Sequence, residues 1–167
     1  MAGLMYREDM DDVRDRLSRW WNGGDIGRPV LLITAPREKP MEDIPAVPAP
    51  QGWLTHYSTR DFDYRVHLAK RACVNTHYLG EAVPFVAPDL APNCLALYLG
   101  CTGIEQHDTV WCEPCIEEPE TARFEYDPDN FYWQFTLRLG RVMRRIGNNK
   151  FLTAFPDLIE GLDTLAA

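Results

Sequence analysis

Apolar positions along the chain recur with two spacings, which predict helices and short strands in alternation. Apolar residues three or four positions apart, the spacing of an amphipathic helix, run through 6–21, 59–78, 93–99 and 131–146. Short, mainly apolar segments, too short for helices and typical of buried strands, lie near 29–34, 83–87 and 150–155. Strands that alternate with helices form parallel sheets, so the chain is predicted to be an α/β protein.

One segment interrupts this alternation. Between 103 and 118, isolated apolar residues lie among polar ones, and Thr109–Cys112 has strand propensity. We interpret this segment as a hairpin inserted between the second predicted strand and the helix 131–146.

Charged side chains follow the predicted strands closely. Pro88-Asp89 ends the run 83–87, Pro156-Asp157 follows the run 150–155, and Arg37 comes shortly after the first run. Right-handed connections place the carboxyl ends of parallel strands at one edge of the sheet, where active sites of such proteins lie. Arg37, Asp89 and Asp157 are therefore expected on a common face. A helix N-cap is the alternative role for both aspartates, because this residue type is favoured there.

Length and charge narrow the classes of function. The chain has 167 residues, enough for one domain with its own core, and a single domain over 1–167 is predicted. Its formal charge of −8 and the lack of a basic stripe argue against a nucleic-acid partner. The sequence contains no apolar run of the roughly 18 residues that span a membrane and no signal-peptide pattern, so a cytoplasmic location without membrane contact is expected.

The five cysteines predict no metal or redox site. Without an export signal they are interpreted as reduced thiols. Cys112 and Cys115 have C-x-x-C spacing, but a zinc ribbon needs a second such pair. A thioredoxin-like site needs the motif at the start of a helix, and this pair lies in a strand-like stretch.

The final apolar helical pattern, from Leu158 to Leu165, has no cap or polar tail before Ala167. A closed barrel of this type needs about 250 residues. We expect the chain to be the first part of a longer protein; a small open-sheet domain is the alternative.

Several segments in order resemble one family. They are Arg28–Leu32, Phe62-Asp63, Tyr78–Pro84, Leu97–Gly100, Thr109–Trp111 and Asp157–Asp163. This ordered set resembles the uroporphyrinogen decarboxylase-like superfamily, in particular its divergent bacterial members. The resemblance implies the N-terminal part of a (β/α)8 TIM-type barrel, with about three βα units and the inserted hairpin.

The resemblance also implies roles for individual residues. Asp89 matches the aspartate that, in the decarboxylase, follows the second strand, holds pyrrole N–H groups and stabilises a cationic intermediate. Arg37 is what remains here of an arginine-rich loop that grips substrate carboxylates. The repeated strand–turn pattern, and not the resemblance, makes Asp157 the second candidate for substrate binding. The implied activity is decarboxylation of a porphyrinogen-like or other small carboxylated molecule, with no cofactor bound by this chain.

Two further readings stay open. Related corrinoid methyltransferases bind zinc through residues of the C-terminal half of the barrel, beyond this sequence, and work with a corrinoid protein. A non-catalytic α/β binding domain is the other reading. A homodimer is a possible assembly, and the chain alone is expected to be inactive.

Overall fold

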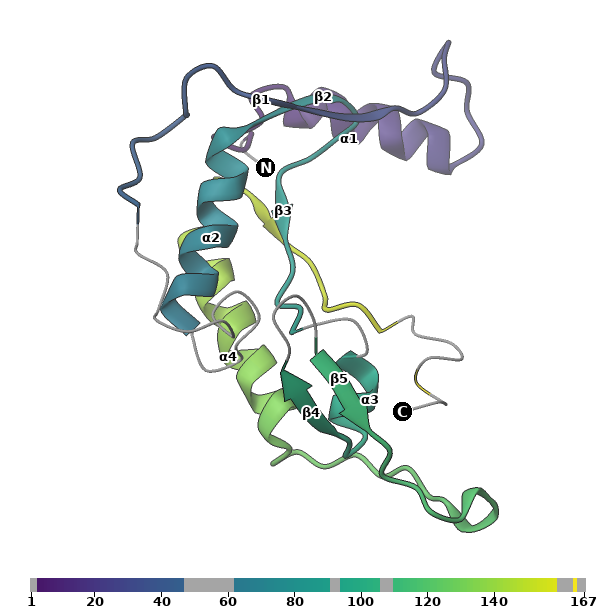
Figure 1. Ribbon diagram of the computed structural model, residues 1–167. Helices are drawn as coiled ribbons and strands as arrows, with labels where there is room; N and C mark the ends of the chain where they lie inside the picture. Colours follow the sequence, from purple (N-terminus) through teal and green to yellow (C-terminus); the bar gives the residue numbers. More distant parts are fainter. Residues whose placement is uncertain (1–2, 47–61, 91–93, 106–109, 159–163, 165–167) are drawn as a thin grey trace. The chain divides into compact units, whose positions relative to one another are not determined.

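The computed structural model describes residues 3–46, 62–90, 94–105, 110–158 and 164 (Figure 1). Its helices are α1 (Met10–Trp21), α2 (Phe62–Asn75), α3 (Cys94–Tyr98) and α4 (Phe131–Ile146), with a short 3-10 turn at Pro119–Thr121. Its strands are β1 (Leu32–Pro36), β2 (Thr76–Gly80), β3 (Phe85–Val86), β4 (Thr102–Glu105), β5 (Val110–Glu113) and β6 (Leu152–Thr153). No helix within these ranges is long and apolar enough to cross a membrane.

The described strands form three sheets of two strands each. β1 and β2 are antiparallel, with Thr34 opposite Tyr78. β3 and β6 are parallel, with Phe85 opposite Leu152, and β4 and β5 form an antiparallel hairpin (Figure 1). The parallel pair joins segments about 65 residues apart in the sequence, and it brings together the starts of the two turns that carry Asp89 and Asp157.

Internal contacts divide the chain into two units, each made of three segments. The first unit comprises Met1–Ala46, His67–Val86 and Met143–Thr153, and the second comprises Val47–Val66, Ala87–Val142 and Ala154–Ala167. The first contains α1 and the sheets β1–β2 and β3–β6; the second contains α3 and the β4–β5 hairpin. Helices α2 and α4 contribute residues to both.

Each unit has its own buried apolar residues. In the first unit the fully or nearly fully buried side chains are Tyr6, Met10, Val13, Cys73, Val74, Tyr78, Val86, Met143 and Phe151. In the second they are Tyr64, Leu90, Cys94, Leu97, Cys101, Val110, Phe135 and Leu139. The amphipathic pattern of α4 supplies both sets, because Phe135 and Leu139 lie four residues apart on one face and Met143 follows at the same spacing.

Several predicted elements are confirmed. Helix α4 spans the predicted residues 131–146, α3 lies within the predicted 93–99, and the inserted hairpin is β4–β5. The predicted strands at 83–87 and 150–155 are present as β3 and β6, and they pair in parallel as expected. The barrel and the single domain over 1–167 stay predictions.

Two predictions about the first strand, its parallel neighbour and its burial on both faces, were wrong. The helix predicted to Tyr78 ends at Asn75, and Thr76–Gly80 forms β2 against β1, so β1 has an antiparallel neighbour where a parallel one was expected. Pairing with β1 overrides the helical spacing of this segment. Burial then alternates along β2, as in a strand: Tyr78 is buried, whereas His77 and Leu79 are exposed. β1 was also expected to be buried on both faces, yet Leu32 is 73% exposed.

The start of the first helix also differs from the prediction. The helix was expected from Tyr6, but Leu4–Arg7 forms a tight turn closed by a bridge, and α1 begins at Met10. Main-chain N–H groups of Met5 and Tyr6 instead donate to carbonyls of Asn149 and Lys150. This contact fixes the segment that carries Tyr6 and Arg7.

Candidate functional site

Asp89 and Asp157 meet through a hydrogen bond within the second unit. The main-chain N–H of Asp157 donates to Oδ1 of Asp89 at 2.8 Å. Asp89 lies three residues after β3 and Asp157 four residues after β6, and both side chains are exposed. The prediction that these two turns lie together is confirmed. The contact orients the Asp89 carboxylate while leaving it accessible to a ligand.

Arg65, in the first turn of α2, forms hydrogen bonds with the main chain of the turn that carries Asp89. Its guanidinium donates to the carbonyl of Asp89 at 2.9 Å and to the carbonyl of Leu90 at 3.1 Å. The Leu90 N–H in turn donates to the Cys94 sulfur at 3.3 Å, and Leu90 is buried. These contacts restrain the main chain at Asp89 and Leu90.

The alternative role of Asp89 as a helix N-cap stays a prediction, because residues 91–93 lie outside the described residues. Helix α3 begins at Cys94, five residues later, and the described contact of the Asp89 carboxylate is with the N–H of Asp157. An N-cap side chain accepts from the second or third N–H of its own helix. Within the described ranges, the Asp89 carboxylate is therefore positioned by the main chain of the neighbouring turn.

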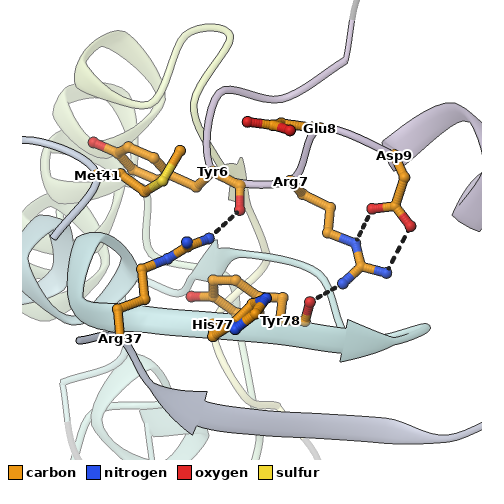
Figure 2. Close-up of a pocket in the computed structure, with 8 residues that line it drawn as sticks. All are labelled: Tyr6, Arg7, Glu8, Asp9, Arg37, Met41, His77 and Tyr78. Carbon is orange, nitrogen blue, oxygen red and sulfur yellow. Dashed lines mark hydrogen bonds and ion pairs between the residues drawn. The ribbon is translucent and has the colours of Figure 1, made fainter. Parts of the chain in front are cut away.

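Arg37 belongs to the first unit, where it lines a cavity of about 180 Å³ (Figure 2). Its Nε donates to the carbonyl of Thr76 at 2.9 Å and one Nη to the carbonyl of Tyr6 at 3.4 Å. No described carboxylate forms an ion pair with Arg37. The other lining residues are Tyr6, Arg7, Glu8, Asp9, Met41, His77 and Tyr78.

The charges around this cavity are partly compensated. Arg7 and Asp9 form an ion pair at 2.7 Å, whereas Arg37 and Glu8 make no described ion pair. Burial raises the pKa of Tyr78 above its usual range, so its phenol stays neutral at ordinary pH. The wall thus offers one half-buried guanidinium, one exposed carboxylate and neutral polar groups, which suits a small molecule with a carboxylate. Arg37 together with Asp89 and Asp157 on one face stays a prediction.

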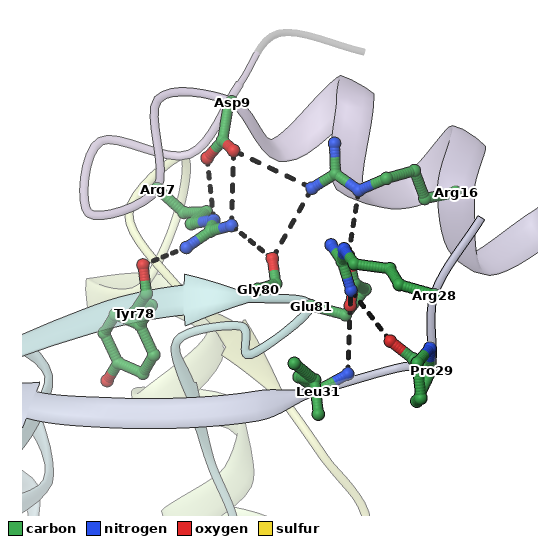
Figure 3. A network of polar contacts seen from close by, with 9 residues as sticks. All are labelled: Arg7, Asp9, Arg16, Arg28, Pro29, Leu31, Tyr78, Gly80 and Glu81. Carbon is green, nitrogen blue, oxygen red and sulfur yellow. Dashed lines mark hydrogen bonds and ion pairs between the residues drawn. The ribbon is translucent and has the colours of Figure 1, made fainter. Parts of the chain in front are cut away.

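Glu81 is the charged residue that sequence reasoning missed (Figure 3). It is fully buried, and its two oxygens accept hydrogen bonds from Arg16 at 2.8 Å, from Arg28 at 2.7 Å and from the Leu31 N–H at 3.1 Å. The hydrogen bonds from Arg28 hold the pKa of Glu81 down at about 2, against the opposing effect of burial. The sequence does contain a signal for this ion pair, because Glu81 lies directly between Gly80 and an apolar run, where a charged side chain is buried only with a partner.

Arg7 forms hydrogen bonds with the end of β2, directly before Glu81. This arginine is 7% exposed and donates to the carbonyls of Tyr78 and Gly80, the latter at 2.6 Å (Figure 3). Gly80 has a φ of 60°, and a Cβ added there would lie 2.3 Å from the Leu31 carbonyl. Only glycine fits this left-handed position. The arginines and Gly80 together fix the chain between β2 and β3, the segment that leads to Asp89.

Metal-ligating side chains do not cluster within the described ranges. No group of three or more histidine, cysteine, aspartate or glutamate residues there has the geometry to hold a metal ion. In the methyltransferase alternative, as the resemblance implies, zinc would be bound by residues of the C-terminal half of the barrel, and the corrinoid would belong to a separate protein.

Comparison of the chain with known protein families, with curated proteins and with solved structures finds no match. The resemblance to the uroporphyrinogen decarboxylase-like superfamily therefore stays a prediction based on the residues quoted for it.

Proposed function

We propose that this chain is the N-terminal portion of a uroporphyrinogen decarboxylase-like enzyme, which removes a carboxyl group from a porphyrinogen-like or other small carboxylated substrate. The observation that carries the proposal is the Asp89 carboxylate. It is exposed, it is oriented by the N–H of Asp157, and it lies just beyond one of two parallel strands. Active sites of parallel α/β proteins lie at this position.

Asp89 acts in this proposal as an electrostatic anchor. Its Oδ1 accepts a hydrogen bond from the Asp157 N–H. A fixed carboxylate attracts an N–H-bearing group in the ground state and attracts it more strongly once that group becomes cationic. Decarboxylation through a protonated ring creates such a charge, which the carboxylate stabilises before the C–C bond to the leaving CO2 breaks.

Arg37 is assigned to a substrate carboxylate. A guanidinium with two donors already committed to the carbonyls of Thr76 and Tyr6 retains further N–H groups for an anion. Arginine is well suited to this role because its donors match the spacing of carboxylate oxygens. Asp157 contributes its main-chain N–H to Asp89 and is a positioning residue in this scheme.

The test is an activity assay of the full-length product of the gene that encodes this sequence. The protein is incubated with uroporphyrinogen and with a panel of small carboxylic acids, and CO2 release and product mass are followed. The proposal predicts CO2 release together with a product that has lost a carboxyl group. Absence of CO2 release from every substrate, or methyl transfer to a corrinoid instead, would contradict it.

A cytoplasmic location is part of the proposal. Fractionation of the source cells, with the protein found in the membrane or secreted fraction, would overturn it.

A further inference from the structure

Cys101 and Cys115 lie in direct contact although the sequence separates them by 14 residues. The Cys101 thiol donates to the Cys115 sulfur, and the two sulfurs are 3.2 Å apart. The β4–β5 hairpin explains the contact, because Thr102 pairs with Glu113 and the two cysteines lie just outside this last pair. The hairpin thus brings Cys101 next to Cys115 of the C-x-x-C sequence, a contact that the spacing of the cysteines alone could not reveal.

The two thiols differ in accessibility. Cys101 is 4% exposed, whereas Cys115 is exposed and open to a small reagent. Burial, followed by the contact with Cys115, raises the pKa of Cys101 to about 12, so this thiol keeps its proton and remains a donor. An accessible thiol beside a buried one is the arrangement in which the first reacts with an external disulfide and the second resolves the product.

We propose that Cys101 and Cys115 are an oxidisable thiol pair that forms an intramolecular disulfide by exchange with a small disulfide such as oxidised glutathione. The thiolate of Cys115 attacks one glutathione sulfur, the glutathione S–S bond breaks, and one glutathione thiol leaves. In this mixed disulfide the Cys101 sulfur attacks the Cys115 sulfur and its proton passes to the departing glutathione sulfur, which leaves as the second glutathione thiol. Two protein thiols are oxidised, one disulfide is reduced to two thiols, and the two protons end on glutathione.

The geometry favours Cys101 over Cys112 as the partner of Cys115. A disulfide needs sulfurs about 2.0 Å apart, and the Cys101–Cys115 pair at 3.2 Å has to close by only about 1.2 Å. Cys112 lies within β5, where it pairs with Gly103, so a C-x-x-C disulfide would have to bend the end of this strand. The Cys101–Cys115 bond would instead tie the end of α3 to the end of the hairpin without disturbing the ladder.

Oxidation would stabilise the second unit. The bond would close the loop between Cys101 and Cys115. A cross-link over a loop of this length restricts the unfolded chain and so stabilises the folded one. We expect the melting temperature of the oxidised chain to exceed that of the reduced chain by about 5 °C.

The experiment treats the reduced chain with oxidised glutathione, alkylates the remaining thiols and maps the peptides by mass spectrometry. The wild type and Cys112→Ser are expected to lose two of their thiols to a Cys101–Cys115 peptide cross-link. Cys101→Ser is expected to accumulate glutathione on Cys115, and Cys115→Ser to form no cross-link. Cys115 is exposed, so its variant keeps the fold and remains informative even if Cys101→Ser does not fold.

Three outcomes would overturn the proposal: five free thiols in the folded wild type after treatment, a Cys112–Cys115 cross-link, or glutathione that stays on Cys115 with no resolution. None of them depends on the activity assay, so the two proposals can fail separately.

Discussion

Glu81 is a fully buried carboxylate surrounded by donors, and its charge is part of the fold. Its pKa lies at about 2 in the folded chain, against an ordinary value of 4.5, chiefly because Arg28 donates to it. A lowered pKa contributes stability above pH 4.5, and this contribution is lost as the pH falls toward 2. The residue therefore links acid stability to the segment that leads to Asp89.

Replacing Glu81 by glutamine should remove this contribution. At pH 7 we expect Glu81→Gln to lower the free energy of unfolding by roughly 2 kcal/mol, less than the full shift in pKa implies, because Arg16 and Arg28 partly face solvent. The difference from wild type should vanish near pH 2. Urea denaturation from pH 7 to pH 2 measures both, with Asp15→Asn on the exposed side of α1 as the control. An equal loss at both pH values would contradict an electrostatic origin.

The two aspartates show how far topology predicts individual residues. Asp89 and Asp157 were expected together because both follow predicted parallel strands, and their hydrogen bond confirms this. Arg65 could not be expected in the same place, since its sequence position lies in a helix with no pattern that points to a turn. Its two bonds to carbonyls depend on packing between elements, which a single sequence does not encode locally.

Among the elements, α4 begins with a well-formed cap. The side-chain oxygen of Asn130 accepts the N–H of Trp133 at 2.9 Å, and its amide nitrogen donates to the carbonyl of Leu97 at 3.0 Å. The same residue thus caps α4 and ties it to the end of α3.

A pair of substitutions separates these two roles of Asn130. We expect Asn130→Ala to lower the free energy of unfolding by about 1–2 kcal/mol, because it removes the cap and leaves the Leu97 carbonyl without this donor. Asn130→Asp retains the capping oxygen and adds a negative charge that suits the helix N-terminus, but it places an oxygen against the Leu97 carbonyl, so a smaller loss than for Asn130→Ala is expected. Thermal and urea unfolding of the two variants measure the difference. If both variants match the wild type, the cap contributes nothing to stability.

Elements with a strong periodic pattern were predictable, and those that depend on pairing were not. Helix α4 carries apolar residues at helical spacing over its full length, which fixed its ends at Phe131 and Ile146. β2 was assigned to the preceding helix because Thr76–Tyr78 continues that helix's spacing. Its strand conformation comes from five main-chain pairs with β1, a contact about 45 residues away in sequence.

At the scale of the whole molecule, large apolar side chains remain exposed on several strands and their flanks. Leu32 on β1 is 73% exposed and Phe155, two residues after β6, is 91% exposed. Further exposed apolar residues on or beside the strands are Leu31, Ile33, Leu79, Phe85, Ile104, Trp111 and Leu152. Exposed apolar strand surfaces favour association.

We therefore expect copies of this chain to associate as concentration rises. Replacing Leu32 and Phe155 together by glutamate should shift the chain toward the monomer without changing its circular dichroism. Ser18→Glu adds a charge at an exposed position of α1, outside the apolar strands, and it should leave association unchanged. Sedimentation velocity over a concentration series is the measurement. A wild-type chain that stays monomeric throughout would contradict this expectation.

The central claim is that the Asp89 carboxylate takes part in the chemistry. Its most direct test is the turnover rate of the full-length gene product carrying Asp89→Asn, measured on the substrate that the wild type decarboxylates. Asparagine keeps an oxygen for the Asp157 N–H but loses the charge and replaces the second oxygen by an NH2 donor, and Asp129→Asn, at an exposed site, is the control. The account predicts a fall in kcat on the order of 100-fold with an unchanged melting temperature. A variant that keeps its fold and turns over at the wild-type rate would contradict it.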